Sequence, residues 1–332
     1  DLSNFSKSHI EEITRELDKF KESGKDVIAW FSDADNNSYD IALSASKIYM
    51  PDADSASLTL KGYYQTLPYL KDAFDKIGLE FNVIHIGSFK GTGENFVRNN
   101  ISNELASSYL NILKNINQLS IERISKRRGI SIATLKELYA TGRTILMTPK
   151  DALSYKLIDG IKSYEDIFDE LSKYKTIYRV SVVDYINFLK KQKRVAKDKI
   201  AILYIEGTIT NYYNSDDNFS GSVVGAKSII SDINKIKNDE TVKAVILRIN
   251  SPGGSALASE LILQELVKLK KEKPLYVSFG PIAASGGYYI SCAGEKIFTT
   301  NSTITGSIGV VSIFLNHKRL NEKIGVNFAT IK

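Results

Sequence analysis

The chain has 332 residues, 43% of them hydrophobic and 25% charged, which is typical of a globular protein long enough for two domains with sizeable cores. Its 44 basic and 38 acidic residues give a formal charge of +6. The lysines are spread along the chain, with few arginine or aromatic clusters, so the sequence gives little indication of nucleic-acid binding. The single cysteine, Cys292, excludes an internal disulfide framework and a Cys-x-x-Cys metal site, and no apolar run reaches the ~18 residues of a membrane-spanning helix.

The first half of the chain combines helical patterns with one clear strand. A helical pattern begins at His9, and residues 81–86 alternate like a half-buried strand. A glycine-bracketed turn that contains Lys90 follows this strand. Residues 94–129 then predict one or two long helices, and Thr148 begins a further one.

A basic segment, residues 187–199, separates the two halves of the chain. Its charge run favours a solvated linker, and contact with an anionic membrane is the less favoured alternative. We therefore expect an N-terminal part over residues 1–186 and a C-terminal part over residues 200–332.

Strand and helix patterns alternate in the second half. Strands are expected at 200–205, 244–249 and 275–279, and helices at 224–236 and 257–269. A Ser-Pro-Gly-Gly turn separates a strand from a helix, and Ser255 is a plausible N-cap. Cys292 lies in an apolar helix start and is expected to pack inside. This alternation predicts an α/β fold with mostly parallel strands under covering helices.

Three segments of the first half recur in the second half in the same order. Residues 25–31, 39–49 and 76–81 match residues 273–279, 288–298 and 323–328, at offsets of 248, 249 and 247. We interpret the chain as two tandem repeats. The alignment leaves the first repeat without its opening strands and ends the second one at Lys332, which aligns with His85. We therefore expect a central fragment of a longer protein, and the start at Asp1 leaves room for a preceding signal or anchor.

Ser285 is the candidate nucleophile. It lies in an Ala-Ala-Ser-Gly-Gly motif just past the strand at 275–279, where two glycines let a substrate backbone approach a hydroxyl. A serine hydroxyl needs a base that takes its proton. The three histidines, His9, His85 and His317, are poorly placed for this role, because two lie on helical patterns and the third alternates within a strand.

Lys90 is the better candidate for the base, although it is 195 residues away. A free lysine has a pKa of ~10.4, so it accepts a proton near neutral pH only if burial or its neighbours lower that pKa. We predict that Lys90 projects into a largely apolar seam between the repeats, with no carboxylate within salt-bridge reach. Asn36 aligns with Ser285, so the first repeat is expected to be structural at that position.

Three motifs and the lysine turn closely resemble the signal peptide peptidase A family, also called protease IV, in its long two-repeat form. The motifs are Asn-Ser-Pro-Gly-Gly-Ser at 250–255, Ala-Ala-Ser-Gly-Gly-Tyr-Tyr at 283–289 and Thr-Gly-Ser-Ile-Gly at 305–309, and the lysine turn is Gly-Ser-Phe-Lys at 87–90. The resemblance implies the spiral Clp/crotonase fold and a serine protease with a Ser285–Lys90 dyad that digests signal peptides left in the membrane after secretion. The Gly-Pro-Ile at 280–282 departs from the family pattern and affects the approach to the nucleophile.

The resemblance also implies supporting roles. Ser307 would orient the Lys90 amine, with Thr305 as a weaker helper. The backbone N–H groups of Gly286 and of either Gly253 or Gly254 would stabilise the oxyanion, a placement that their glycine turns also favour.

Assembly and location follow from the same resemblance. It implies a ring-like homo-oligomer, a tetramer, at the extracytoplasmic (periplasmic) face of a bacterial cell membrane, which it would reach through a segment absent from this chain. No metal or organic cofactor is indicated.

Two other classes of function remain open. A crotonase-type acyl-thioester enzyme would share the fold and its oxyanion turns, but it would not need a serine-lysine pair between repeats. A non-catalytic scaffold would keep the repeats and lose the pair.

Overall fold

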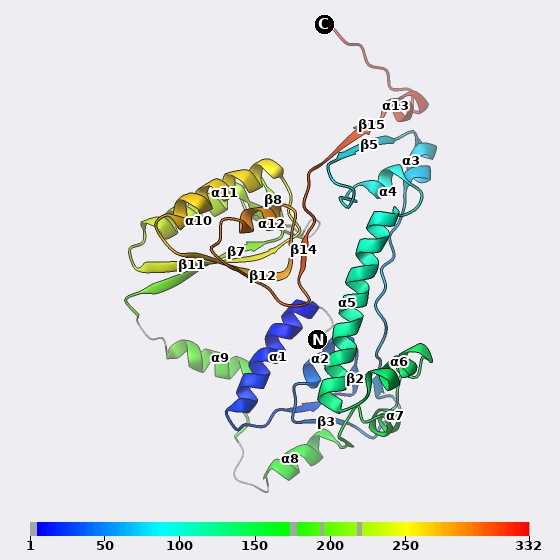
Figure 1. The fold of residues 1–332 in the computed structure, drawn as a ribbon, viewed down its shortest axis with the longest axis vertical. Coiled ribbons are helices and arrows are strands. Elements are labelled where there is room, and N and C mark those ends of the chain that lie inside the picture. Colours follow the sequence, from blue (N-terminus) through cyan, green and yellow to red (C-terminus); the bar gives the residue numbers. More distant parts are fainter. Residues whose placement is uncertain (1–4, 173–177, 193–195, 218–220, 332) are drawn as a thin grey trace.

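The computed structural model describes residues 5–172, 178–192, 196–217 and 221–331. The chain forms a mixed α/β structure with two sheet-containing parts, the N-terminal part at the bottom of Figure 1 and the C-terminal part at its upper left. A third region, at the upper right, combines segments from both halves of the sequence.

A small parallel sheet forms the core of the N-terminal part. Its strands are, in order, β1 (Ile28–Trp30), β3 (Lys47–Met50) and β6 (Gly160–Ile161), with a separate pair of β2 (Asp33–Ala34) and β4 (Ser57–Leu58). The helices around it are α2 (Asn36–Ala42), α6 (Ile132–Ala140), α7 (Pro149–Ser154) and α8 (Tyr164–Ser172). The buried Tyr39 donates its hydroxyl to the carbonyl of Leu157 at 2.5 Å, which satisfies the one polar group that this ring brings into the core.

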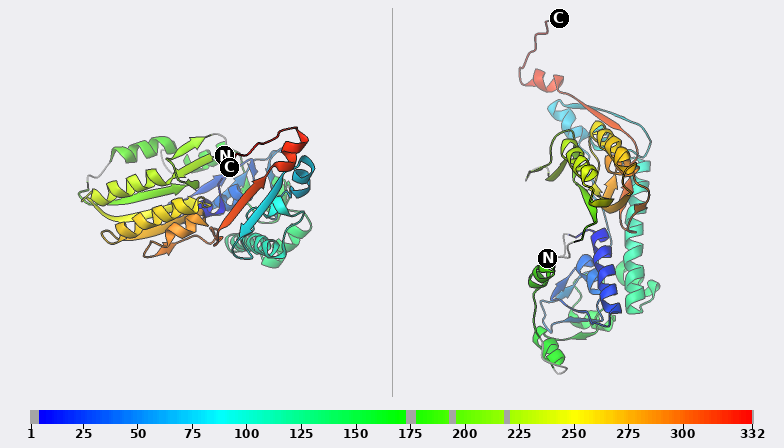
Figure 2. Two further views of the ribbon diagram at one scale, coloured as in Figure 1. Left: turned by 90° about the horizontal axis from the view of Figure 1, so that it is seen from above. Right: turned by 90° about the vertical axis from the view of Figure 1, so that its left-hand side faces the viewer.

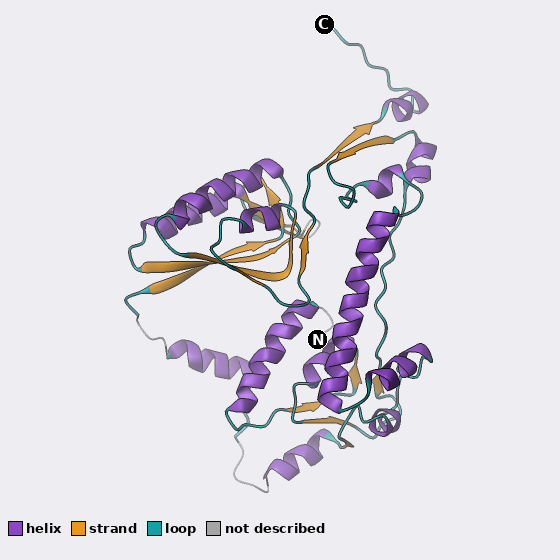
Figure 3. Cartoon of the chain, in the orientation of Figure 1, coloured by secondary structure: helices purple, strands orange, loops and turns teal. Residues whose placement is uncertain are grey.

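The main sheet of the C-terminal part has five parallel strands, four of which form its path, while the fifth, described below, also pairs with β12. The four strands of the path are, in order, β13 (Ile297–Phe298), β12 (Leu275–Ala284), β11 (Val242–Ser251) and β7 (Lys199–Glu206). The helices α10 (Ala226–Asn238), α11 (Ala256–Lys270) and α12 (Gly286–Ser291) lie along one face (Figure 3). Alternate residues of β11, namely Val245, Leu247 and Ile249, are buried, as the two-residue period of a strand requires. A smaller sheet of β8 (Thr208–Thr210), β10 (Gly221–Gly225) and β9 (Ser215–Asp217) lies between β7 and α10 in the chain.

Strand β12 changes its partner on one edge near Pro281 and keeps β11 on the other. Residues 275–279 pair with β11, whose register shifts between Ile249 and Ser251 before Ser251 pairs with Ala283. On the opposite edge, residues 277–278 pair with β13 and residues 282–284 with β14 (Ile304–Gly306). Proline has no N–H to donate, so a regular ladder cannot continue through it. The end of β12, directly before Ser285, is therefore held against β14.

An antiparallel strand pair joins the two halves. Strand β5 (Glu80–His85) lies beside β15 (Val311–Asn316), and their register places His85 opposite Val311. The short helices of this region are α3 (Lys71–Ile77), α4 (Glu94–Val97) and α13 (Lys318–Lys323). The long helix α5 (Asn103–Arg128) runs from this region to the N-terminal sheet (Figure 2). Lys90, which follows β5 in the chain, is thereby held against the C-terminal part.

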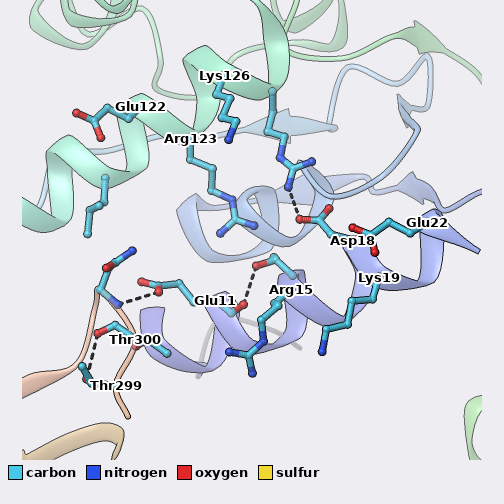
Figure 4. Close-up of a pocket in the computed structure, with 14 residues that line it drawn as sticks. Glu11, Arg15, Asp18, Lys19, Glu22, Glu122, Arg123, Lys126, Thr299 and Thr300 are labelled. Carbon is cyan, nitrogen blue, oxygen red and sulfur yellow. Dashed lines mark hydrogen bonds and ion pairs between the residues drawn. The ribbon is translucent and has the colours of Figure 1, made fainter. Parts of the chain in front are cut away.

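Helix α1 (Lys7–Glu22), in the N-terminal part, forms an ion pair and hydrogen bonds with the C-terminal part. Glu12 forms an ion pair with Arg248 of β11 at 2.7 Å. Glu11 accepts the N–H of Asn301 at 3.0 Å and the hydroxyl of Ser302, and Figure 4 shows it pointing toward the loop that contains Thr300. This loop leads directly into β14, so a helix of the first half holds the segment that supports the end of β12.

The structure confirms the α/β class, the parallel strands and the helices expected in the second half, with Ser255 as the N-cap of α11. The linker differs in part, because helix α9 (Val182–Lys191) includes residues 187–191 and β7 begins at Lys199. Two groups of residues lie outside the part of the chain that the structure describes. They are Lys193 and Arg194 of that linker, and residues 1–4 and 332, on which the fragment hypothesis depends.

The expectation that Cys292 packs inside is wrong. Helix α12 has only six residues and ends at Ser291, so Cys292 caps its C-terminus and is exposed.

Candidate active site

Ser285 lies on a sharp turn between β12 and α12. Its backbone adopts φ 51° and ψ −120°, a strained conformation for a residue with a side chain. Its N–H donates to the carbonyl of Gly306 on β14 at 2.9 Å, which holds the turn in place. A strand-to-helix turn of this kind exposes a nucleophile at the end of a sheet.

Tight packing explains why a glycine follows the serine. A Cβ at Gly286 would lie 2.4 Å from the hydroxyl of Ser259 on α11. A Cβ at Gly287 would lie 2.7 Å from the backbone carbonyl oxygen of Ser251 on β11, which cannot move aside as a side chain can. The Gly-Gly of the motif is therefore required by the fit of the helix as well as by access for a substrate.

Lys90 reaches the hydroxyl of Ser285 from the other half of the chain. The distance from its Nζ to Ser285 Oγ is 3.0 Å, between residues 195 positions apart. The same amine lies 2.6 Å from the carbonyl oxygen and 3.1 Å from the hydroxyl of Ser307. The lysine is only 4% exposed. The structure thus brings together the serine and the lysine that the sequence singled out.

The surroundings of Lys90 disfavour its charged form. Burial lowers the pKa of Lys90 below the ordinary value of 10.5. Within the described ranges, no carboxylate lies within 4.0 Å of its amine to restore the charge. A neutral amine can donate to the Ser307 carbonyl and accept the proton of the Ser285 hydroxyl. The arrangement can therefore move a proton from the hydroxyl to the amine.

The neighbouring hydroxyls differ in where they point. Ser307 also has a positive φ, 49°, which turns both its carbonyl and its side chain toward the Lys90 amine. Thr305 donates instead to the carbonyl of Ala283 at 2.7 Å. Thr305 therefore fastens β14 to β12 and does not contact the lysine.

The three glycines that are candidates for the oxyanion hole differ in whether their backbone N–H already has a hydrogen-bond acceptor. Gly253 donates its N–H to the buried hydroxyl of Ser251 at 3.1 Å. The amides of Gly254 and Gly286 have no acceptor among the residues that the structure describes, and both glycines line the cleft beside Ser285. A Cβ at Gly286 would be 3.4 Å from the Gly254 nitrogen, so these two amides are close neighbours. Both amides are therefore available to a group bound in the cleft.

A cleft of about 910 Å³ opens beside Ser285 between α11, α12 and the segment that leads into β15. Its walls are mainly apolar and aromatic, and they include Leu257, Tyr288, Tyr289, Ile308, Val310 and Val311. Lys90 and Glu260 are the only charged side chains among the described residues that line it. Its volume lies within the range of ligand-binding clefts.

Glu260 and Tyr289 were not identified from the sequence. Each lies one turn into its helix, since Tyr289 is four residues after Ser285, the N-cap of α12, and Glu260 is four residues after Ala256, the first residue of α11. This spacing was the signal that could have placed them beside the nucleophile.

The other sequence candidates lie away from this cleft. The ring of His85 contacts the carbonyl of Gly87 at 3.1 Å, and neither His9 nor His317 is among the described residues that line the cleft. Asn36 accepts the N–H of Lys61 at 2.8 Å and donates back to the carbonyl of the same residue at 2.8 Å. It anchors a backbone segment at the start of α2.

Among the described residues, no cluster of three or more His, Cys, Asp or Glu side chains is arranged to hold a metal ion. No described helix has the length and apolar character needed to cross a membrane.

Comparisons with known proteins match most of the chain. The model of the family described as "Peptidase family S49" matches residues 19–178 and 267–332. A protein of Arabidopsis thaliana, "Serine protease SPPA, chloroplastic", is 31% identical over 97% of this chain and 48% of its own length. "Protease 4" of Haemophilus influenzae is 32% identical over 94% of this chain and 52% of its own length. A protein of Enterococcus faecium provisionally named signal peptide peptidase SppA is 42% identical over 42% of this chain and 41% of its own length. The chain therefore spans about half the length of these relatives.

Proposed function

The chain belongs to peptidase family S49, and we propose that it is a serine endopeptidase in which Ser285 is the nucleophile and Lys90 the general base. The observation that supports this most strongly is the 3.0 Å contact between Lys90 Nζ and Ser285 Oγ at the buried end of an apolar cleft. A lysine that is neutral because it is desolvated is an established partner for a serine nucleophile.

The proposed reaction proceeds through an acyl-enzyme. The Lys90 amine takes the proton of Ser285 as Oγ attacks the peptide carbonyl, and the Lys90 ammonium then gives that proton to the leaving amine. A water molecule next attacks the ester, with Lys90 accepting its proton. Lys90 then returns that proton to Ser285 Oγ as the ester C–O bond breaks, and the acid product leaves. Ser307 keeps the amine directed at Ser285 throughout, through contacts of 2.6 Å and 3.1 Å.

We assign the oxyanion hole to the amides of Gly286 and Gly254. Each pre-aimed donor of this kind lowers the barrier by ~2.7 to 4 kcal/mol in comparable enzymes. Gly253, the alternative considered from the sequence, keeps its N–H on Ser251 and supports the turn.

We propose signal peptides, and other extended apolar peptides, as the substrates. The apolar cleft supports this, as do the names of the relatives SPPA and SppA and the motif resemblance. By the same likeness we propose a membrane-associated homo-oligomer, a tetramer, at the periplasmic face of a bacterial cell membrane.

We also propose that the two halves are tandem repeats of a Clp/crotonase-like unit. Helices α1, α2 and α3 begin 249, 250 and 247 residues before α11, α12 and α13, which supports the offset seen in the sequence. One repeat would then supply the lysine and the other the serine.

A fluorophosphonate probe, read by peptide mass spectrometry, tests the proposed function. We expect label on Ser285 in the wild type, none in Ser285→Ala, and strong loss in Lys90→Met, which keeps the side-chain length without the amine. Lys71→Met is the matched control, because this exposed lysine pairs with Asp75 on α3. Label that survives Lys90→Met would mean another base, and no label at all would favour a crotonase-type or scaffold role.

A further inference from the structure

A single carboxylate lies in the wall of the apolar cleft, and the proposed reaction does not use it. Glu260 is half-buried on α11, where residues of the same helix, Ala256 and Leu257, also line the cleft. The hydroxyl of Tyr289 donates to its Oε2 at 2.5 Å, and Gln264 donates to its Oε1 at 2.6 Å. The position of the carboxylate is therefore fixed from two sides.

The carboxylate faces the same space as the nucleophile. Tyr289 donates its N–H to the carbonyl of Ser285 at 2.8 Å, so it lies one helical turn, about 5.4 Å, beyond the serine on α12. Its hydroxyl then bridges to Glu260 on the neighbouring helix α11. A side chain of a substrate that lies beside Ser285 can thus reach Glu260.

No cationic side chain among the described residues pairs with Glu260. None of the ion pairs among the described residues involves this carboxylate, and its two hydrogen-bond partners are uncharged. Donation by Tyr289 and then by Gln264 lowers the pKa of Glu260, so the group stays ionised at neutral pH. An ionised carboxylate with free lone pairs in an apolar wall attracts a cation and repels an acidic side chain.

We propose that Glu260, held by Tyr289, makes the cleft selective for apolar peptides that have a lysine or arginine next to the scissile bond. This inference rests on the proposed function and deepens it. In a signal peptide a basic stretch precedes an apolar one. The cleft offers apolar walls and one carboxylate, so the junction of those two stretches is the segment that fits it.

Matched peptides test the selectivity. They differ only in the residue beside the bond, which is lysine, norleucine or glutamate, and norleucine keeps the lysine alkyl chain without its amine. One set varies the residue before the bond and a second set the residue after it. We expect kcat/KM of the wild type to be about 1.4- to fivefold higher for lysine than for norleucine at one of the two positions, the range of a partly exposed ion pair. This ratio should fall as salt is raised.

Variants separate the local charge from other effects. Glu260→Gln should bring the lysine-to-norleucine ratio close to one, whereas Tyr289→Phe, which keeps the charge and frees the carboxylate, should lower it only in part. Glu265→Gln is the control, because Glu265 is on the same helix but pairs with Lys268 at 2.7 Å and is not among the residues that line the cleft. It should leave the ratio unchanged.

The outcomes distinguish the two proposals. A wild type that prefers norleucine at both positions, or a ratio that is equal in the wild type and Glu260→Gln, overturns the selectivity proposal while leaving the protease intact. An equal fall in Glu265→Gln also overturns it, because the effect would then be one of overall charge. If no peptide is cleaved and no fluorophosphonate label forms on Ser285, the proposed function fails and the selectivity proposal fails with it.

Discussion

Removal of the Ser307 hydroxyl should slow acylation of Ser285 without abolishing it. Lys90 Nζ has two contacts to Ser307, the carbonyl oxygen at 2.6 Å and the hydroxyl at 3.1 Å, and Ser307→Ala removes only the second. One hydrogen bond between uncharged groups contributes about 0.5 to 1.5 kcal/mol. The second-order rate constant of fluorophosphonate labelling should therefore fall roughly two- to twelvefold. The backbone carbonyl still directs the amine, so activity persists.

Two variants isolate the hydroxyl from the backbone. Ser307→Gly loses the same group but adopts a φ of 49° without strain, so an equal loss in both variants assigns the effect to the hydroxyl. Thr305→Val removes a hydroxyl that contacts Ala283 and not the lysine, and it should leave the pH dependence of labelling unchanged. An unchanged rate in Ser307→Ala, or a loss of a thousandfold or more, would refute this reasoning.

Three further predictions follow from the same contacts. Because burial lowers the pKa of Lys90, the rate of Ser285 labelling should rise with pH through that lowered pKa, and a flat pH–rate profile would argue against lysine as the base. The stability of the wild type relative to Lys90→Met should also rise with pH between the folded and unfolded pKa values of Lys90, since the folded state binds fewer protons there. Ser251→Ala leaves the N–H of Gly253 without its acceptor, so it should lower the free energy of unfolding in denaturant by about 1 to 3 kcal/mol and slow the labelling of Ser285. An unchanged midpoint of denaturant unfolding would contradict a contribution of this buried hydrogen bond to stability. Glu11→Gln weakens the hydrogen bond from the Asn301 N–H and should lower the rate of Ser285 labelling with little change in Tm. A lower Tm with an unchanged labelling rate would mean that α1 only supports the fold.

Local patterns in the sequence were enough to predict the secondary structure around the site. The β-branched runs of β7 and β11 follow the two-residue period of a strand with one face buried, and Ser255 accepts the N–H of Ala258 as an N-cap does. The Gly-Gly after Ser285 predicts room for a substrate backbone, and in the structure the missing side chains also leave room for α12 to pack against Ser259 and Ser251. These features depend on residues a few positions apart, and a sequence shows such neighbours directly.

The geometry of the site depended on contacts between distant segments. Two tertiary contacts bring Lys90 to Ser285 across 195 positions: β5 pairs with β15, and α1 forms a hydrogen bond to the loop before β14. No local sequence pattern specifies which strands pair. Tertiary packing also left the N–H of Gly254 without an acceptor among the described residues, and the short helix α12 left Cys292 exposed. Residue identity alone determined that a serine, a lysine and glycine turns were available. Only the folded chain decided that the lysine is buried without a carboxylate partner, because desolvation and hydrogen bonding are properties of the assembled surroundings and not of the residue itself.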